Sequence, residues 1–149
     1  YYIIEGVEQY SSKTKIKLKE FPGISAHVVS ALEKLGIKDT LKLYDRVLTA
    51  KKRKELSKET EIPETNVTEL TCLCDLSRIK WVGVTFARML YDIGIDSVEK
   101  AAQSDPEKLH QRINQFNKDK NIFKGHIGLN DIRIFAEAAK EVPQEIEYE

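Results

Sequence analysis

Two stretches of the sequence, FPGISAHVVSALEKLGI (residues 21–37) and IKWVGVTFARMLYDIGI (residues 79–95), share one pattern, and this pattern decides the fold. Each begins with an apolar residue, passes through a short turn into a segment with helical apolar spacing, and closes on Gly-Ile. The two copies superpose with an offset of 58 residues, which aligns Gly23 with Trp81. Two copies of one supersecondary unit predict a pseudo-symmetric pair.

Helical spacing continues through most of the chain outside these two stretches. It predicts helices over residues 40–49, 50–60, 64–77 and 130–142, and two more that begin after a cap at residue 96 or 97 and at Asp105-Pro106. Thr49 is placed to cap the helix over residues 50–60. A chain of 149 residues is the size of one ordinary domain. We therefore predict a single, mainly α-helical domain.

The beginning of the chain has a different pattern. Residues 13–19, KTKIKLK, alternate lysine with other residues, and this period of two predicts a strand. YYII at the start and EIEY near the end are also strand-like. We predict a strand-like extension over residues 1–17, a tandem-unit domain over residues 18–149, and a small β element at the termini. We favour a solvated strand face for these lysines; the alternative is a binding stripe.

Composition narrows the class of protein. The chain is 41% hydrophobic and 32% charged, with a formal net charge of zero. Residues 1–60 carry a net charge of +5 and residues 61–149 a net charge of −5, a modest imbalance for a nucleic-acid binder. No apolar run reaches the ~20 residues of a membrane span. No secretory signal is visible, so we expect a cytoplasmic location, although the first residue is Tyr1 and we expect truncation or processing before it.

Catalytic chemistry finds little support in the sequence. His27, His110 and His126 are scattered without metal-ligand spacing, and GHIG at residues 125–128 is a loop with one histidine. There is no phosphate-binding loop, dinucleotide motif or nucleophile elbow. Cys72 and Cys74 would point apart on a helix, so we expect two unpaired thiols. The sequence predicts no catalytic residue, metal or cofactor, and therefore no enzyme.

The repeated pattern is similar to the hairpin of helix-hairpin-helix proteins, apolar-x-Gly-apolar-Gly-x-x-x-Ala. The run from about residue 18 to 148 resembles the uncharacterised DUF4332 family, which carries two such units. Besides the first repeat, the resemblance is carried by KKRKELSKETEIPETNV, LSRIKWVGVTFARMLYDIGIDSVEKAAQSDPEKLHQRINQFNKDKN and AAKEVPQEIEY. It implies tandem helix-hairpin-helix-like units, with hairpins near residues 21–25 and 79–84, and no agreed biochemical activity.

In helix-hairpin-helix proteins generally, the resemblance implies a sequence-independent grip on the nucleic-acid backbone. The glycines allow positive φ and bring N–H groups at a helix N-terminus against a phosphate, where the helix dipole favours negative charge. Such a contact positions the protein without reading sequence. The candidate contact residues are Gly23, Ile24 and Ser25 in the first hairpin, Lys80, Trp81, Val82, Gly83 and Val84 in the second, and the basic residues Lys51, Lys52 and Arg53.

Neither hairpin keeps both glycines. Ser25 stands where the first copy needs its second glycine, and Trp81 stands at the first glycine position of the second copy. A tryptophan with positive φ is strained by ~1 kcal/mol or more, unless the turn has changed type. We favour Trp81 as a lid packed on the neighbouring helix; the alternative is an exposed aromatic side chain that stacks on a base or anchors a protein partner.

Two classes of function are consistent with these observations. The first is a non-catalytic module that binds DNA or RNA backbone without sequence specificity. The alternative is a protein-interaction or assembly domain that keeps the fold without binding nucleic acid. The resemblance favours the first class, whereas the zero net charge and the lost glycines favour the second. No membrane partner is expected.

Overall fold

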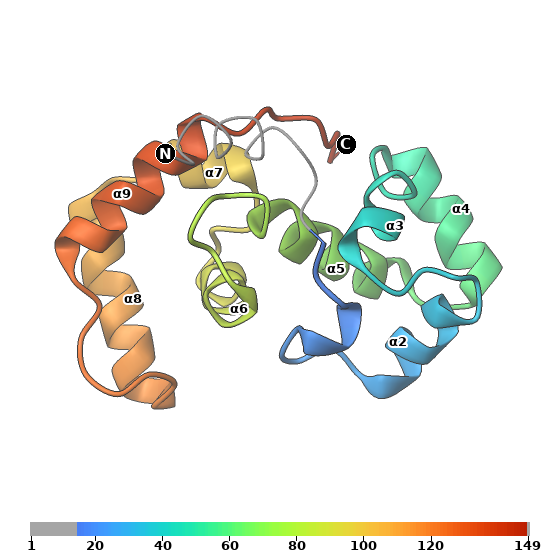
Figure 1. Cartoon of the computed structure of the whole chain (residues 1–149), viewed down its shortest axis with the longest axis horizontal. Helices are drawn as coiled ribbons and strands as arrows, with labels where there is room; N and C mark the ends of the chain where they lie inside the picture. Colours follow the sequence, from blue (N-terminus) through green and yellow to red (C-terminus); the bar gives the residue numbers. More distant parts are fainter. Residues whose placement is uncertain (1–14, 149) are drawn as a thin grey trace.

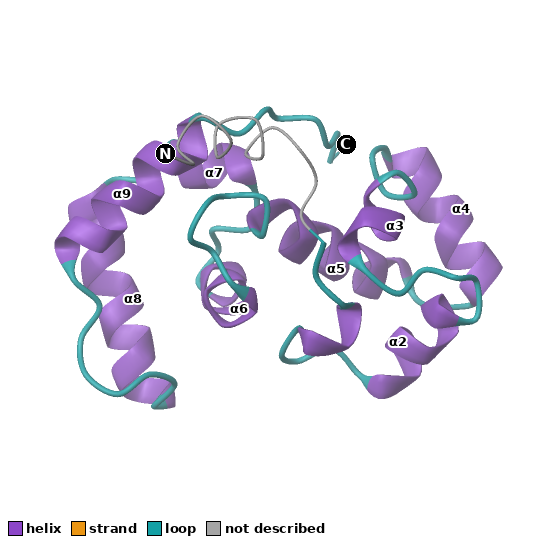
Figure 2. Ribbon diagram, in the orientation of Figure 1, coloured by secondary structure: helices purple, strands orange, loops and turns teal. Residues whose placement is uncertain are grey.

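The computed structural model describes residues 15–148, in which a short 3-10 helix is followed by eight α-helices. The helices are η1 (Leu18–Glu20), α2 (Ala26–Glu33), α3 (Thr40–Tyr44), α4 (Ala50–Thr60), α5 (Glu64–Leu76), α6 (Val84–Asp92), α7 (Val98–Ala102), α8 (Pro106–Lys120) and α9 (Leu129–Lys140). Figure 1 shows α2 to α4 on one side of α5 and α6 to α9 on the other. Figure 2 shows helices joined by loops. The mainly α-helical class is confirmed.

The backbone geometry recurs at the spacing of the sequence repeat. Gly23 has φ +82° and Trp81 has φ +76°, so the tryptophan does adopt the conformation of the glycine it replaces. Gly36 and Gly94, which end the two repeats, have φ +81° and +94°. The closing hydrogen bonds also recur, from the Ile37 N–H to the Leu32 carbonyl and from the Ile95 N–H to the Leu90 carbonyl. The turn has therefore kept its type, and Trp81 carries the strain that this implies.

The repetition extends beyond the hairpins. Asp39 caps α3 by accepting a hydrogen bond from the Lys42 N–H, and Ser97 caps α7 in the same way. Helices α4 and α8 both end on a left-handed residue, Glu61 and Asn121. Each unit thus contains four helices in the same order, α2 to α5 and α6 to α9. The assignment of these units to the helix-hairpin-helix class rests on the sequence resemblance.

Capping residues in the sequence correctly predicted where two of the helices begin. Thr49 caps α4, and Asp105 caps α8 with Pro106 at its first position, as predicted. Helix α3 is shorter than the predicted helix over residues 40–49, because it ends at Tyr44. The chain then turns so that Val47 is buried, with its carbonyl accepting a hydrogen bond from Arg53.

The predicted β element is wrong within the described residues, which contain no strand. Lys17 forms only an isolated bridge with Asp39, and residues 145–148 are irregular. The period of two fails because the chain turns at η1, which buries both Leu18 and Phe21. The strand-like residues YYII and most of the predicted extension lie outside the described residues.

Helix α5 forms the centre of the core. Residues 71–79 at its end and just beyond are all buried, and α5 packs against helices of both units, namely α3, α4, α6 and α7. Cys72 and Cys74 lie in this stretch as free thiols, as predicted. Because both thiols are removed from water, burial raises their pKa values to about 12.

This burial predicts a loss of stability at alkaline pH. An unfolded cysteine has a pKa of about 8.5, so above that pH the unfolded chain releases protons that the folded chain retains. Between about pH 7.5 and pH 9, we expect the free energy of unfolding to fall by about 1 kcal/mol or more. Urea unfolding under reducing conditions would measure this.

The matched control is the double variant Cys72→Ala/Cys74→Ala, whose stability should depend less on pH over the same range. An equal pH dependence in both proteins would contradict the role of the thiols. In the folded wild-type protein, both thiols should also resist alkylation.

A buried network ties the C-terminal segment, residues 143–148, to the core. The Asp75 carboxylate bonds Arg78 at 2.6 Å, accepts the Tyr148 hydroxyl at 2.7 Å and accepts the Val98 N–H at 3.1 Å. Arg78 also donates to the Pro143 carbonyl. Asp75 therefore links α5, the start of α7 and the C-terminal segment through one carboxylate.

Candidate functional site

The second hairpin turn presents Trp81 to solvent. Ile79 and Val82 on either side of the turn are buried, and the Val82 N–H donates to the Ile79 carbonyl. Between them, Trp81 is 64% exposed, so the predicted lid is wrong and the alternative, an exposed aromatic side chain, is observed. Gly83 begins α6 and offers no side chain to cap the helix. The turn thus combines a strained backbone with an exposed indole ring.

The first hairpin turn is occupied by a side chain of the second unit. A Cβ atom on Gly23 would lie 2.7 Å from Cζ of Arg88, so the arginine packs directly on the glycine. Arg88 is bonded to Glu69 at 2.6 Å and to Asp92 at 3.3 Å, so carboxylates already balance its charge. This glycine therefore allows close contact between the units.

The other candidate residues of the first hairpin have local structural roles. The Ser25 hydroxyl accepts a hydrogen bond from the Val28 N–H at 3.3 Å and caps α2. Ile24 is partly buried and packs against the core. Of the two hairpins, only the second carries an exposed large side chain in its turn.

The basic run at the start of α4 divides into exposed and buried members. Lys51 and Lys52 are exposed, but Arg53 is only 5% exposed. Its guanidinium donates to the carbonyls of Val47 and Glu147, each at 2.7 Å. The prediction of Arg53 as a surface cation is therefore wrong, because it lies three residues before the fully buried Leu56 on the inner face of α4. Figure 1 shows α4 at the outer edge of the first unit, away from α8 and α9.

Trp81 lies at the edge of an open hollow of about 680 Å³, which we call the tryptophan groove. Its apolar lining comes from the second hairpin, α6, the loop before α9, and α9 itself: Trp81, Val82, Phe86, Phe123, Ile127, Ile132, Ile134 and Phe135. Phe86 and Phe135 pack edge to face, with ring centroids 5.5 Å apart. Phe123 is 40% exposed and Ile134 is 44% exposed. Three of the large apolar side chains exposed among the described residues therefore line one groove.

The loop over residues 121–128 forms one wall of the groove and is held by two asparagines of α8. Asn117 accepts from the Phe123 N–H and donates to the carbonyls of Phe123 and Gly125. Asn114 accepts from the Ile127 N–H at 2.8 Å and donates to the Ile127 carbonyl. These bonds replace backbone pairing and fix the position of Phe123.

A second hollow of about 630 Å³ continues from the first, and both are lined by Phe123, Lys124 and His126. Here the Nε2 atoms of His110 and His126 lie 3.0 Å apart, although the two residues are distant in sequence. The described residues contain no group of three or more His, Cys, Asp and Glu side chains that could hold a metal ion.

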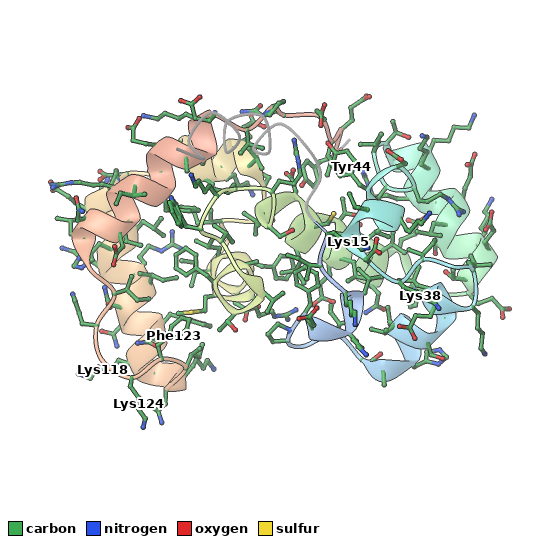
Figure 3. All side chains as sticks on the ribbon, in the orientation of Figure 1. Lys15, Lys38, Tyr44, Lys118, Phe123 and Lys124 are labelled. Carbon is green, nitrogen blue, oxygen red and sulfur yellow. The ribbon has the colours of Figure 1, made fainter. Side chains whose placement is uncertain are left out.

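Two lysines and one aspartate line these hollows, and a third lysine lies beside them on the Trp81 ring. Lys80 places Nζ 4.7 Å from the centre of the Trp81 ring, a cation–π contact. Lys118 and Lys124 line the second hollow, and Figure 3 shows them with Phe123 where α8 passes into the loop. Asp131 is the acidic residue among those that line the tryptophan groove.

The structure brings together only part of the set proposed from the sequence. Lys80, Trp81, Val82, Gly83 and Val84 are consecutive and form the second hairpin with the start of α6. Sequence reasoning missed Phe123, Lys124 and Ile134, which the fold places in the hollows beside Trp81. The asparagines at positions 114 and 117, one helical turn apart on α8, were the available signal for an ordered loop.

Comparisons with known proteins agree with the resemblance seen in the sequence. The model of one protein family, described as "Domain of unknown function (DUF4332)", matches residues 22–142, which is most of the chain. Neither a curated protein nor a solved structure matches the chain significantly. Within residues 15–148, no helix is long and apolar enough to span a bilayer.

Proposed function

Since the chain belongs to the DUF4332 family, whose name carries no function, we propose from the groove itself that this domain is a non-catalytic protein-interaction module. The tryptophan groove is its docking site. One observation carries the proposal: a tryptophan that is 64% exposed is held at φ +76° at the edge of an apolar groove.

Both properties of Trp81 are costly for the isolated domain. A positive φ costs a non-glycine residue roughly 1–2 kcal/mol, and the equivalent position of the first unit is a glycine without this cost. An exposed indole also leaves a large apolar surface in water. Strain and exposure at the same residue are typical of functional sites, and tryptophan is the residue type most enriched among interface hot spots.

Selection from a random peptide library displayed on phage would test the proposal. We expect enriched peptides whose affinity falls about 30-fold in Trp81→Ala, since truncating a hot spot costs about 2 kcal/mol. Leu35→Ala is the matched control, because Leu35 is also exposed (44%) but does not line the groove. Failure to select any peptide, or equal losses in both variants, would contradict a docking site at Trp81.

Nucleic-acid backbone binding is the second candidate function, and one observation favours it. Gly83 is the N-cap of α6 and offers no capping side chain, and it lies two residues after Trp81, whose ring Lys80 contacts. A phosphate at this helix N-terminus would be supported by the helix dipole and the lysine. The occupied turn at Gly23 and the apolar lining of the groove weigh against it.

Binding of labelled duplex and single-stranded DNA and RNA across a salt series tests this second candidate. Log affinity should fall with log salt, with a slope of roughly one per phosphate neutralised. Gly83→Glu should weaken binding without unfolding the domain, because nothing lies within 4 Å of a Cβ placed there. Absence of binding at low salt would remove nucleic acid as the ligand.

A further inference from the structure

The chemistry around the tryptophan groove restricts what kind of segment can dock there. The apolar lining includes the edge-to-face pair of Phe86 and Phe135 and the exposed rings of Trp81 and Phe123. A peptide segment laid along the groove would cover the exposed side chains of Trp81 and Phe123. The occupant therefore needs several apolar side chains on one face.

The fold also restricts the conformation of that segment. An extended peptide commonly binds by adding a strand to a sheet edge, but residues 15–148 contain no sheet to extend. The groove lies instead between α6, α9 and the loop that precedes α9. An apolar groove lined by helices accepts the apolar face of an amphipathic helix. The side chains that enter such a groove stand at positions i, i+3, i+4 and i+7 of the bound helix.

The charged side chains near the groove determine which polar residues the bound helix should carry beside its apolar positions. Lys80 lies on the Trp81 ring, and Lys118 and Lys124 line the adjoining hollow, against Asp131 as the acidic residue of the groove lining. Positive side chains around an apolar groove attract a partner with negative side chains and repel one with positive side chains. We propose that the tryptophan groove binds an amphipathic helix of a partner protein whose polar positions are acidic, an inference that rests on the proposed function.

Two peptide libraries with identical random apolar positions would test this preference. In one library the polar positions are Asp and Glu, and in the other they are Lys and Arg. We expect binders that depend on Trp81 to come from the acidic library. Equal enrichment from both libraries, or enrichment from the basic one, would overturn the acidic preference while the proposed docking function stands.

The fluorescence of Trp81 gives a direct readout, since it is the single tryptophan of the chain. A bound acidic peptide should shift its emission to the blue and protect it from acrylamide quenching, because the exposed ring becomes covered. A binder that leaves Trp81 emission unchanged would place the contact elsewhere and contradict the inference.

Charge reversal provides the matched pair of variants. Lys124→Glu should weaken the selected acidic peptide about fivefold to tenfold, because it replaces an attraction near the groove by a repulsion. Lys58→Glu, the same change on the exposed surface of α4, should leave affinity unchanged. Equal effects of the two variants would show that only net charge matters, which contradicts a local contact.

The remaining outcomes separate this inference from the proposed function. If neither library yields a binder that depends on Trp81, both the inference and the proposed function fail. If no peptide binds but a single-stranded oligonucleotide quenches Trp81, the groove binds nucleic acid and the inference is wrong.

Discussion

Replacing Asp75 by alanine is expected to lower the free energy of unfolding by about 3–5 kcal/mol, the typical cost of removing one partner of a buried ion pair. The Arg78 side chain is 1% exposed and its closest ionic partner is Asp75, at 2.6 Å. The variant also removes the acceptor for the Tyr148 hydroxyl and the Val98 N–H. A typical domain has only about 5–15 kcal/mol of stability, so this loss threatens folding itself.

Glu145→Ala is the matched control, because Glu145 is the other carboxylate bonded to Arg78. Its side chain is 48% exposed, and the N···O distance is 3.2 Å. Water screens this ion pair, but Glu145 also accepts a hydrogen bond from the hydroxyl of the buried Tyr44. We therefore expect a loss of about 1–2 kcal/mol, smaller than the loss at Asp75. Urea unfolding of both variants measures the difference. Equal losses would contradict the importance of burial at Asp75.

A milder change keeps the prediction testable if Asp75→Ala does not fold. Tyr148→Phe removes one hydroxyl from the network and should cost about 1 kcal/mol. The C-terminal segment should then become more accessible to carboxypeptidase, because one of its attachments to α5 is lost. A variant with unchanged stability would mean that this hydrogen bond contributes little.

Replacing Trp81 by glycine is expected to stabilise the domain while weakening docking. Relief of the positive φ gains roughly 1–2 kcal/mol, and the greater freedom of glycine in the unfolded chain offsets about 0.5–1 kcal/mol of it. The expected net gain is about 0.5–1 kcal/mol. Binding of the selected peptides should fall about 30-fold, as in the alanine variant.

Trp81→Ala separates the two effects, because alanine removes the indole but keeps the backbone strain. We expect the glycine variant to be more stable than the alanine variant by about 1 kcal/mol, with equal loss of binding. Thermal or urea unfolding of the pair measures the strain directly. If alanine is as stable as glycine, the strain at this turn does not exceed the unfolded-state cost of glycine, and the strain argument for a functional Trp81 fails.

The aligned position in the first unit, Gly23, can be compared directly with Trp81. Gly23 has the same backbone conformation as Trp81, but its missing side chain makes room for Arg88. The two aligned positions therefore have different structural roles. Gly23 permits contact between the units, whereas the Trp81 side chain lies exposed, away from the core.

Much of the fold could be read from local patterns. The repeat at an offset of 58 residues predicted that Trp81 would occupy a turn that favours positive φ, and its φ is +76°. The caps at Thr49 and Asp105 were also predicted, because a cap joins residues only two or three positions apart. The strand over KTKIKLK failed because a period of two cannot reveal a turn imposed by the burial of Leu18 and Phe21.

The candidate site was only half predictable. The sequence pointed to the second hairpin, but it also suggested Arg53 as a surface cation. Arg53 lies on the inner face of α4, and its guanidinium donates to the carbonyl of Glu147, 94 residues away, a contact that no local pattern contains. Phe123 was missed for the same reason, since its place beside Trp81 depends on how Asn117 holds the loop.

By itself, the sequence determined the helical class, the repeated pattern and the position of Trp81 in a turn that favours positive φ, because these depend on periodicity, caps and backbone conformation within a few residues. The alternative of a turn that had changed type was excluded only by the observed φ of +76°. Only the tertiary structure decided whether the indole would be covered or exposed. That outcome depends on which distant surfaces meet: Arg88 fills the first turn, whereas α9 and the loop at residues 121–128 leave an open apolar groove beside the second.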